Sequence, residues 1–306
     1  MLSHYGGLGL LDRFEPGSLL DSIATKFVVL GGQGPTVFFI SSGYVLYESF
    51  KRVPRFREFL IIRYFRLMPL YLFVSVVAAI IQNQSTDYLT FFLKLFFLDI
   101  IFESAYQFSP INIAFFIVME FWLSLTLVLT VMIPKYIKSS LINFYYCSLV
   151  FFSFIVHFSV GYFAQSFGDD RFHYEILRFQ FWFILGSVLK AYSSKLAFTK
   201  LWNLGVFGFI LSAFMSEFYL GYFIGIASLM FLLSEIDSRP VLPLILIGNI
   251  CYSVYLLHQP LLYLFTQRLD LASWVIYLIC LTIAIFTFRF IEIPFMKIGK
   301  KIALKV

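Results

Sequence analysis

The stretch Arg63-Tyr64-Phe65-Arg66-Leu67-Met68-Pro69-Leu70-Tyr71 opens an apolar run that continues to Gln82. A helix needs about 20 apolar residues to cross a hydrocarbon core of about 30 Å, and residues 60–82 supply that length. Within lipid a helix satisfies all of its own backbone hydrogen bonds, which an open loop or sheet edge does not. The stretch therefore predicts a membrane-spanning helix with two arginines near its start.

The composition of the whole chain extends this prediction to all 306 residues. Apolar residues make up 60% of the chain and charged residues 13%, about half the share usual in a soluble domain. The mean hydropathy is +0.88. Aromatic residues reach 21%, a composition that suits lipid-facing surfaces and interfacial belts. These values exclude a soluble domain and predict an all-α, polytopic transmembrane helical bundle that forms a single domain over residues 1–306.

Apolar runs long enough for spanning or core helices recur along the chain. We expect them near residues 28–50, 60–82, 111–133, 141–163, 175–192, 201–216, 218–234, 241–262 and 271–292. A tenth would be the first span, of which only the end is present around His4. Residues 88–103 carry Lys94 and Asp99 among phenylalanines and leucines, a pattern typical of an amphipathic interfacial or re-entrant helix.

The net charge of +6 indicates topology rather than a nucleic-acid partner, because the basic residues lie in short loops between apolar runs. If residues 88–103 do not cross the membrane, most basic residues fall on one side, which the positive-inside rule makes cytoplasmic. These are Lys51, Arg52, Arg55, Arg57, Arg63, Arg66, Lys135, Lys138, Lys190, Lys195, Lys200, Arg239, Lys297, Lys300, Lys301 and Lys305. This bias favours about ten spans.

Four motifs recur in a fixed order along the chain. They are Phe38-Phe39-Ile40-Ser41-Ser42-Gly43-Tyr44-Val45-Leu46, the arginine stretch 63–71, Gly248-Asn249-Ile250-Cys251-Tyr252-Ser253-Val254-Tyr255-Leu256-Leu257-His258-Gln259-Pro260, and Phe290-Ile291-Glu292-Ile293-Pro294-Phe295. In order and spacing they resemble the acyltransferase 3 family of bacterial integral membrane O-acyltransferases. The resemblance implies acyl transfer, most naturally of acetyl from cytosolic acetyl-CoA, to a hydroxyl group.

Arg63 and Arg66 stand three residues apart, so a helix brings them toward one face. Guanidinium groups bind phosphate through two parallel hydrogen bonds, and coenzyme A carries a diphosphate and a ribose phosphate. The resemblance assigns both arginines to binding the acyl-CoA donor. Without it, an anchor on the positive side of the membrane is an equally good interpretation.

His4 is similar to the histidine that closes the family's R-x10-H signature in the first span. The resemblance makes it the catalytic base for the acceptor hydroxyl or a transient acyl carrier, roles that suit imidazole near neutral pH. The arginine of that signature would precede Met1, so we expect either a start codon placed too far downstream or a truncated, inactive copy. A histidine this close to a chain end is otherwise a frayed surface residue.

Glu120 lies deep in the apolar run Ala114-Phe115-Phe116-Ile117-Val118-Met119-Glu120-Phe121-Trp122 and resembles the glutamate of the family's WSLxxE motif. Phe115 and Phe116 stand where that motif has tryptophan and serine. The resemblance implies a catalytic carboxylate that orients His4 or holds the acceptor hydroxyl. An internal salt bridge or a protonated structural carboxyl is the alternative.

Two further sites invite structural interpretations. His258, with Tyr252, Ser253 and Tyr255, could line a cavity, but we favour a packed structural histidine. Arg289 and Glu292, three apart on one helix, are expected to pair with each other. No metal-ligand cluster is visible in the sequence, so we predict no metal.

The resemblance therefore implies an O-acetyltransferase of the cell inner (cytoplasmic) membrane, with acetyl-CoA as donor and a cell-surface polysaccharide, or its lipid-linked precursor, as acceptor. Its other expected partners are membrane lipids, and no nucleic acid is expected. The alternatives are a glycan-precursor transporter or flippase, whose buried polar residues would look similar, and an inactive truncated family member.

Overall fold

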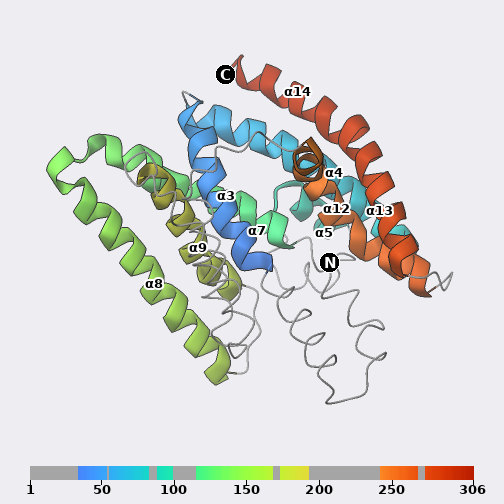
Figure 1. Ribbon diagram of the computed structural model, residues 1–306, viewed down its shortest axis with the longest axis horizontal. Coiled ribbons are helices and arrows are strands. Elements are labelled where there is room, and N and C mark those ends of the chain that lie inside the picture. Colours follow the sequence, from blue (N-terminus) through green and yellow to red (C-terminus); the bar gives the residue numbers. More distant parts are fainter. Residues whose placement is uncertain are drawn as a thin grey trace. The chain divides into compact units, whose positions relative to one another are not determined.

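The computed structural model describes residues 34–53, 55–82, 88–98, 115–167, 173–192, 242–267 and 273–306 (Figure 1). Within these ranges the chain forms helices and no strand, which confirms the predicted all-α fold. Four helical stretches of the described chain are long and apolar enough to cross a membrane. They are Phe56–Ile81, Phe116–Tyr136, Ser139–Val160 and Val275–Ala303.

These four stretches overlap predicted spans, and helices also occupy the described parts of the predicted spans 28–50, 175–192 and 241–262. The predicted spans 201–216 and 218–234, and the first span around His4, lie outside the described residues. The count of ten spans and the single domain over the whole chain therefore stay predictions.

The chain divides into two compact units, which we describe separately. Unit 1 comprises Met1–Arg52 and Leu123–Asp237, and unit 2 comprises Val53–Trp122 and Ser238–Val306. The α-helices described in unit 1 are α3 (Gly34–Lys51), α8 (Ile142–Phe167) and α9 (His173–Tyr192). The π-helical turn η3 (Val128–Met132) comes before α8 in the chain. Those in unit 2 are α4 (Phe56–Gln82), α5 (Tyr88–Leu95), α7 (Phe115–Leu125, as far as Trp122), α12 (Leu242–Gln267), α13 (Ser273–Thr287), the π-helical turn η7 (Phe288–Glu292) and α14 (Ile293–Ala303).

In unit 1, α3 and α9 approach each other closely through two glycines. A Cβ on Gly43 would overlap the backbone carbonyl of Phe183, and a Cβ on Gly186 would overlap that of Ile40. Small residues at a helix crossing let the two backbones come within contact, which is the usual way that membrane helices associate. The glycine of the first motif, Gly43, therefore serves packing.

Helix α8 packs on α9 (Figure 1). Several large apolar side chains of α8 are exposed. Tyr146, Ile184 and Val188 form the buried contact between the two helices. Phe151 and Phe152 are about two-thirds exposed. Exposed aromatic side chains of this number suit a helix whose outer face is covered by lipid rather than water.

The turn η3 interrupts the helix that precedes α8. The N–H of Ile133 donates to the carbonyl of Val128, five residues earlier, so one extra residue is inserted into the turn. Pro134 follows and has no N–H, so it offers no donor to the carbonyls of Leu129 and Thr130. Buried backbone carbonyls need a partner, which must then come from elsewhere.

Two consecutive tyrosines of α8 supply those donors. The hydroxyl of Tyr145 donates to the carbonyl of Leu129, and the hydroxyl of Tyr146 to that of Thr130, each at 2.8 Å. These hydrogen bonds join the end of the η3 helix to the start of α8. The Ile-Pro break and the Tyr-Tyr pair are thus complementary parts of one structural feature.

In unit 2, the predicted helix at 88–103 is described as far as Leu98, and its helical part ends at Leu95. The N–H of Leu98 donates to the carbonyl of Leu93 at 2.9 Å, and Phe97 adopts a left-handed backbone with φ of 55°. This is the ending that glycine usually provides. The ring of Phe97 lies among the rings of Tyr64, Tyr71 and Phe121, whose packing holds the residue in place.

The carbonyls at the end of α5 are bound by neighbouring helices. Tyr64 of α4 donates its hydroxyl to Leu95 O at 2.9 Å, and Trp122 of α7 donates its indole N–H to Phe97 O at 2.7 Å. The last carbonyls of a helix have no partner within it, so these two bonds fix α5 against the body of unit 2.

Lys94 is inside unit 2, with only 1% of its surface exposed. Its Nζ donates to the Tyr71 hydroxyl at 3.2 Å and lies 5.3 Å from the centre of that ring. The sequence predicted an amphipathic interfacial or re-entrant helix here, and it did not indicate that Lys94 would be buried inside unit 2. The tyrosine hydroxyl and ring on α4 together attract the ammonium group inward.

Candidate active site

Arg63 and Glu120 form a buried ion pair between α4 and α7. The Nη2 of Arg63 lies 3.0 Å from Oε1 of Glu120, and the two residues are only 4% and 9% exposed. A single charge within a membrane-spanning segment is costly, and pairing with an opposite charge lowers that cost. Glu120 thus takes the internal salt bridge that the sequence left open as an alternative.

The guanidinium of Arg63 has further capacity to bind. Its Nε is buried and makes no hydrogen bond to any residue that the structure describes. The group lies 6.0 Å from the ring centre of Phe59. Because a guanidinium has five N–H donors in a planar fork, the ion pair with Glu120 leaves donors for another acceptor.

Arg66 differs from Arg63 in its surroundings. Its side chain is exposed, although it stands only three residues further along α4. The sequence predicted that both guanidinium groups project from one face of the helix; in the structure Arg63 is buried and Arg66 is exposed. Glu120 attracts Arg63 into unit 2, whereas Arg66 has no such partner within the described ranges of the chain.

A second buried carboxylate lies on η7. Glu292 is 2% exposed and accepts a hydrogen bond from the hydroxyl of Ser253 on α12. The predicted pair of Glu292 with Arg289 is not formed, and Arg289 is exposed. The N–H of Ile293 donates to the carbonyl of Phe288, and the extra residue in this turn separates the directions of the two side chains.

Tyr252 connects α12 to the arginine helix. Its hydroxyl donates to the backbone carbonyl of Leu67 on α4, and the tyrosine is buried. The next residue of α12 is Ser253, the donor to Glu292. We call Arg63, Glu120, Tyr252, Ser253 and Glu292 together the polar cluster.

The contact between Ser253 and Glu292 was missed in the sequence, although both residues lie within quoted motifs. The signal was the Ile293-Pro294 step that follows Glu292. The same Ile-Pro step follows the π-helical turn η3, so both turns of this kind in the described chain precede it. Turns of this kind often re-aim a side chain at a functional site.

His258 is buried on α12, and its Nδ1 lies 2.5 Å from the carbonyl of Tyr255 one turn earlier. A local hydrogen bond of this kind fits the structural histidine that we favoured. The ring of Tyr255 in turn contacts that of Phe116 on α7, with ring centres 6.0 Å apart. His258 thus belongs to the packing of α12.

His4, the predicted base, lies outside the described residues, so its distance to Glu120 is not given by the structure. The described part of the chain contains no group of three or more His, Cys, Asp or Glu side chains that could hold a metal ion. The candidate site therefore rests on the polar cluster and on the exposed Arg66 beside it.

Comparison with known proteins gives one match. A family model described as an acyltransferase domain matches residues 1–291, nearly the whole chain. No curated protein and no solved structure matches. The matched region includes the whole polar cluster except for Glu292, which follows its last residue directly. The chain belongs to the acyltransferase 3 family and is a multi-pass membrane acyltransferase.

Proposed function

We propose that the protein transfers an acyl group, most naturally acetyl, from cytosolic acyl-CoA to a hydroxyl of a cell-surface polysaccharide or its lipid-linked precursor. We place it in the inner (cytoplasmic) membrane. The observation that carries the proposal is the buried pair of Arg63 and Glu120 beside the exposed Arg66 in a chain of the acyltransferase 3 family. Buried charges in membrane-spanning helices mark functional sites by default.

The arginines suit the donor. Arg66 is exposed on the side that the basic loops predict to be cytoplasmic, where acyl-CoA is found. Its guanidinium can bind a phosphate through two parallel hydrogen bonds. Arg63 is held by Glu120, and its Nε makes no hydrogen bond to the described residues, so it would support the same donor from within.

His4 would act on the acceptor. It would take the proton of the acceptor hydroxyl, whose oxygen then attacks the carbonyl carbon of the thioester. The new ester bond forms as the carbon–sulfur bond breaks, and the proton passes to the leaving thiolate. Glu120 would support His4 or the acceptor hydroxyl while it remains paired with Arg63.

Donor binding tests the role of Arg66. A hydrogen bond to a charged group contributes about 1.5–3 kcal/mol, so Arg66→Ala should weaken acetyl-CoA binding by about tenfold to a hundredfold. Binding would be measured by calorimetry on the purified protein. Arg57→Ala is the matched control, because Arg57 is also an exposed arginine on α4. Equal affinities for the wild type and Arg66→Ala would contradict the assignment.

A further inference from the structure

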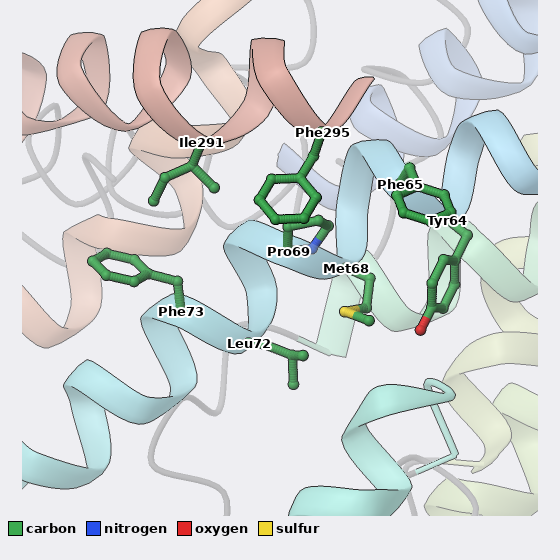
Figure 2. A pocket seen from close by; sticks show the side chains of 8 residues that line it. All are labelled: Tyr64, Phe65, Met68, Pro69, Leu72, Phe73, Ile291 and Phe295. Atoms are coloured by element: carbon green, nitrogen blue, oxygen red, sulfur yellow. The ribbon is translucent and has the colours of Figure 1, made fainter. Parts of the chain in front are cut away.

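Unit 2 has an apolar groove of about 400 Å³ between α4 and the η7–α14 segment (Figure 2). Six of its eight lining residues come from α4, and Ile291 and Phe295 close it from the other side. Figure 2 shows Pro69 of α4 next to the ring of Phe295. The lining surface is almost wholly apolar, so a hydrocarbon chain is the ligand that it suits.

The groove is bordered by a basic amphipathic helix. Beyond Phe295, α14 carries three exposed lysines, Lys297, Lys300 and Lys301, within two turns. Ile298 and Ile302 are also exposed, on a different face of the same helix. Exposed lysines on one face and exposed apolar residues on another are typical of a helix that lies in the membrane interface.

α14 is held against α4 along its inner face. Gly299 faces the side chain of Phe65, where an added Cβ would stand only 2.5 Å from the Cβ of Phe65. Arg55, just before α4, donates to the carbonyl of Val306 at 2.9 Å. These contacts hold α14 against the start of α4, and Phe65, which Gly299 faces, also lines the groove. The lysines of α14 therefore follow directly on the segment that borders the groove, on the side predicted to be cytoplasmic.

We propose that this groove binds an acyl chain of an anionic phospholipid of the cytoplasmic leaflet, whose phosphate is bound by the lysines of α14. Anionic headgroups attract a lysine near the membrane surface by about 1 kcal/mol each, so three lysines favour them over zwitterionic headgroups. In this proposal the apolar groove binds the acyl chain of the lipid, and the lysines bind its negatively charged headgroup. The site uses neither the polar cluster nor Arg66, so it is independent of the proposed acyl transfer.

Quenching by brominated lipid tests this site. Phe73→Trp places a reporter in the groove, and Phe152→Trp places one on the exposed face of α8. Each variant would be reconstituted in vesicles with equal mole fractions of dibrominated phosphatidylglycerol or dibrominated phosphatidylcholine. The signal is the difference from the wild-type chain, which has four tryptophans. We expect at least twofold stronger quenching by phosphatidylglycerol at position 73 and no preference at position 152.

Charge variants complete the test. K297Q/K300Q/K301Q should abolish the preference at position 73 and leave quenching by phosphatidylcholine unchanged, which also shows that the fold is retained. K135Q/K138Q removes two exposed lysines elsewhere and should keep the preference. Equal quenching by the two lipids at position 73, or loss of the preference in both charge variants, would overturn the proposal. The proposal would also be overturned if palmitoyl-CoA reduced the quenching at position 73 and phosphatidylglycerol showed no preference. The groove would then bind the acyl chain of an acyl-CoA donor.

Discussion

Burying the charge of Arg63 in an apolar helix costs free energy, and the ion pair with Glu120 offsets that cost. The guanidinium is nearly inaccessible in a helix that is apolar enough to cross a membrane, a position that an isolated charge would not tolerate. Its carboxylate partner comes from another helix at 3.0 Å. The pair therefore contributes to the folded state and to the candidate site together, and a variant must separate these two contributions.

We expect Glu120→Gln to destabilise the protein by about 3–5 kcal/mol, because it leaves the positive charge of Arg63 buried without its partner. Thermal unfolding in detergent measures this change. The double variant Arg63→Met with Glu120→Met should recover most of the stability, because two apolar side chains of similar size replace the pair. If the double variant is stable and still inactive in acyl transfer, the pair has a role beyond packing. A stable, fully active double variant would show that its role is structural alone.

The sequence indicated both residues but not their pairing. Each was visible as a charge within an apolar run, which is unusual enough to attract notice. Whether Glu120 meets Arg63, His4 or a substrate depends on how α4 and α7 pack, and no local pattern encodes that. Arg66 shows the same limit. The spacing of three residues grouped it with Arg63, but only Arg63 is buried, in the ion pair with Glu120.

At the scale of elements, the contact of α3 with α9 depends on two glycines. We expect Gly43→Ala to destabilise unit 1 by about 1–3 kcal/mol, because the new methyl group would overlap the backbone of Phe183. Gly248→Ala on α12 is the matched control. No described atom lies within 4 Å of the position of its Cβ. There alanine should be neutral or stabilising by about 0.5–1 kcal/mol, since it favours the helix. Equal thermal unfolding temperatures for the two variants would contradict the packing role of Gly43.

The junction of η3 with α8 depends on the tyrosine hydroxyls. Tyr146→Phe should cost about 1–3 kcal/mol, because it leaves the carbonyl of Thr130 without the donor that Pro134 does not provide. Tyr136→Phe is the control, because Tyr136 is 86% exposed and its hydroxyl can be removed without burying a carbonyl unpaired. The two variants would be compared by thermal unfolding, and an equal effect would exclude the proposed role of Tyr146.

Hydropathy predicted the long helices well, because a run of apolar residues is sufficient to identify a span. α4, α8 and α13 lie where the apolar runs placed them. The π-helical turns were not predicted, since one inserted residue leaves hydropathy unchanged, although the Ile-Pro steps marked both places. The prediction for residues 88–103 gave a helix, but it missed the burial of Lys94 because Tyr71, its partner, comes from α4.

At the scale of the whole molecule, the fold class and the family followed from composition and from motif order, and both are confirmed. These properties depend on many residues at once, so the loss of one motif residue does not alter them. The substrates are harder to predict from the sequence than the fold class, because they depend on the few side chains that face the acceptor. His4 lies outside the described residues, and the acetyl donor and glycan acceptor stay proposals.

Acyl transfer itself tests the central claim most directly. Inverted membrane vesicles containing the chain would be supplied with acetyl-CoA labelled in its acetyl group and with the cell's own surface polysaccharide. The account predicts base-labile label in the polysaccharide, lowered at least tenfold by Arg66→Ala and unchanged by Arg57→Ala. The contradicting result would come from vesicles that contain abundant, folded protein and acetyl-CoA. In it, the polysaccharide would gain no more label than in vesicles lacking the chain.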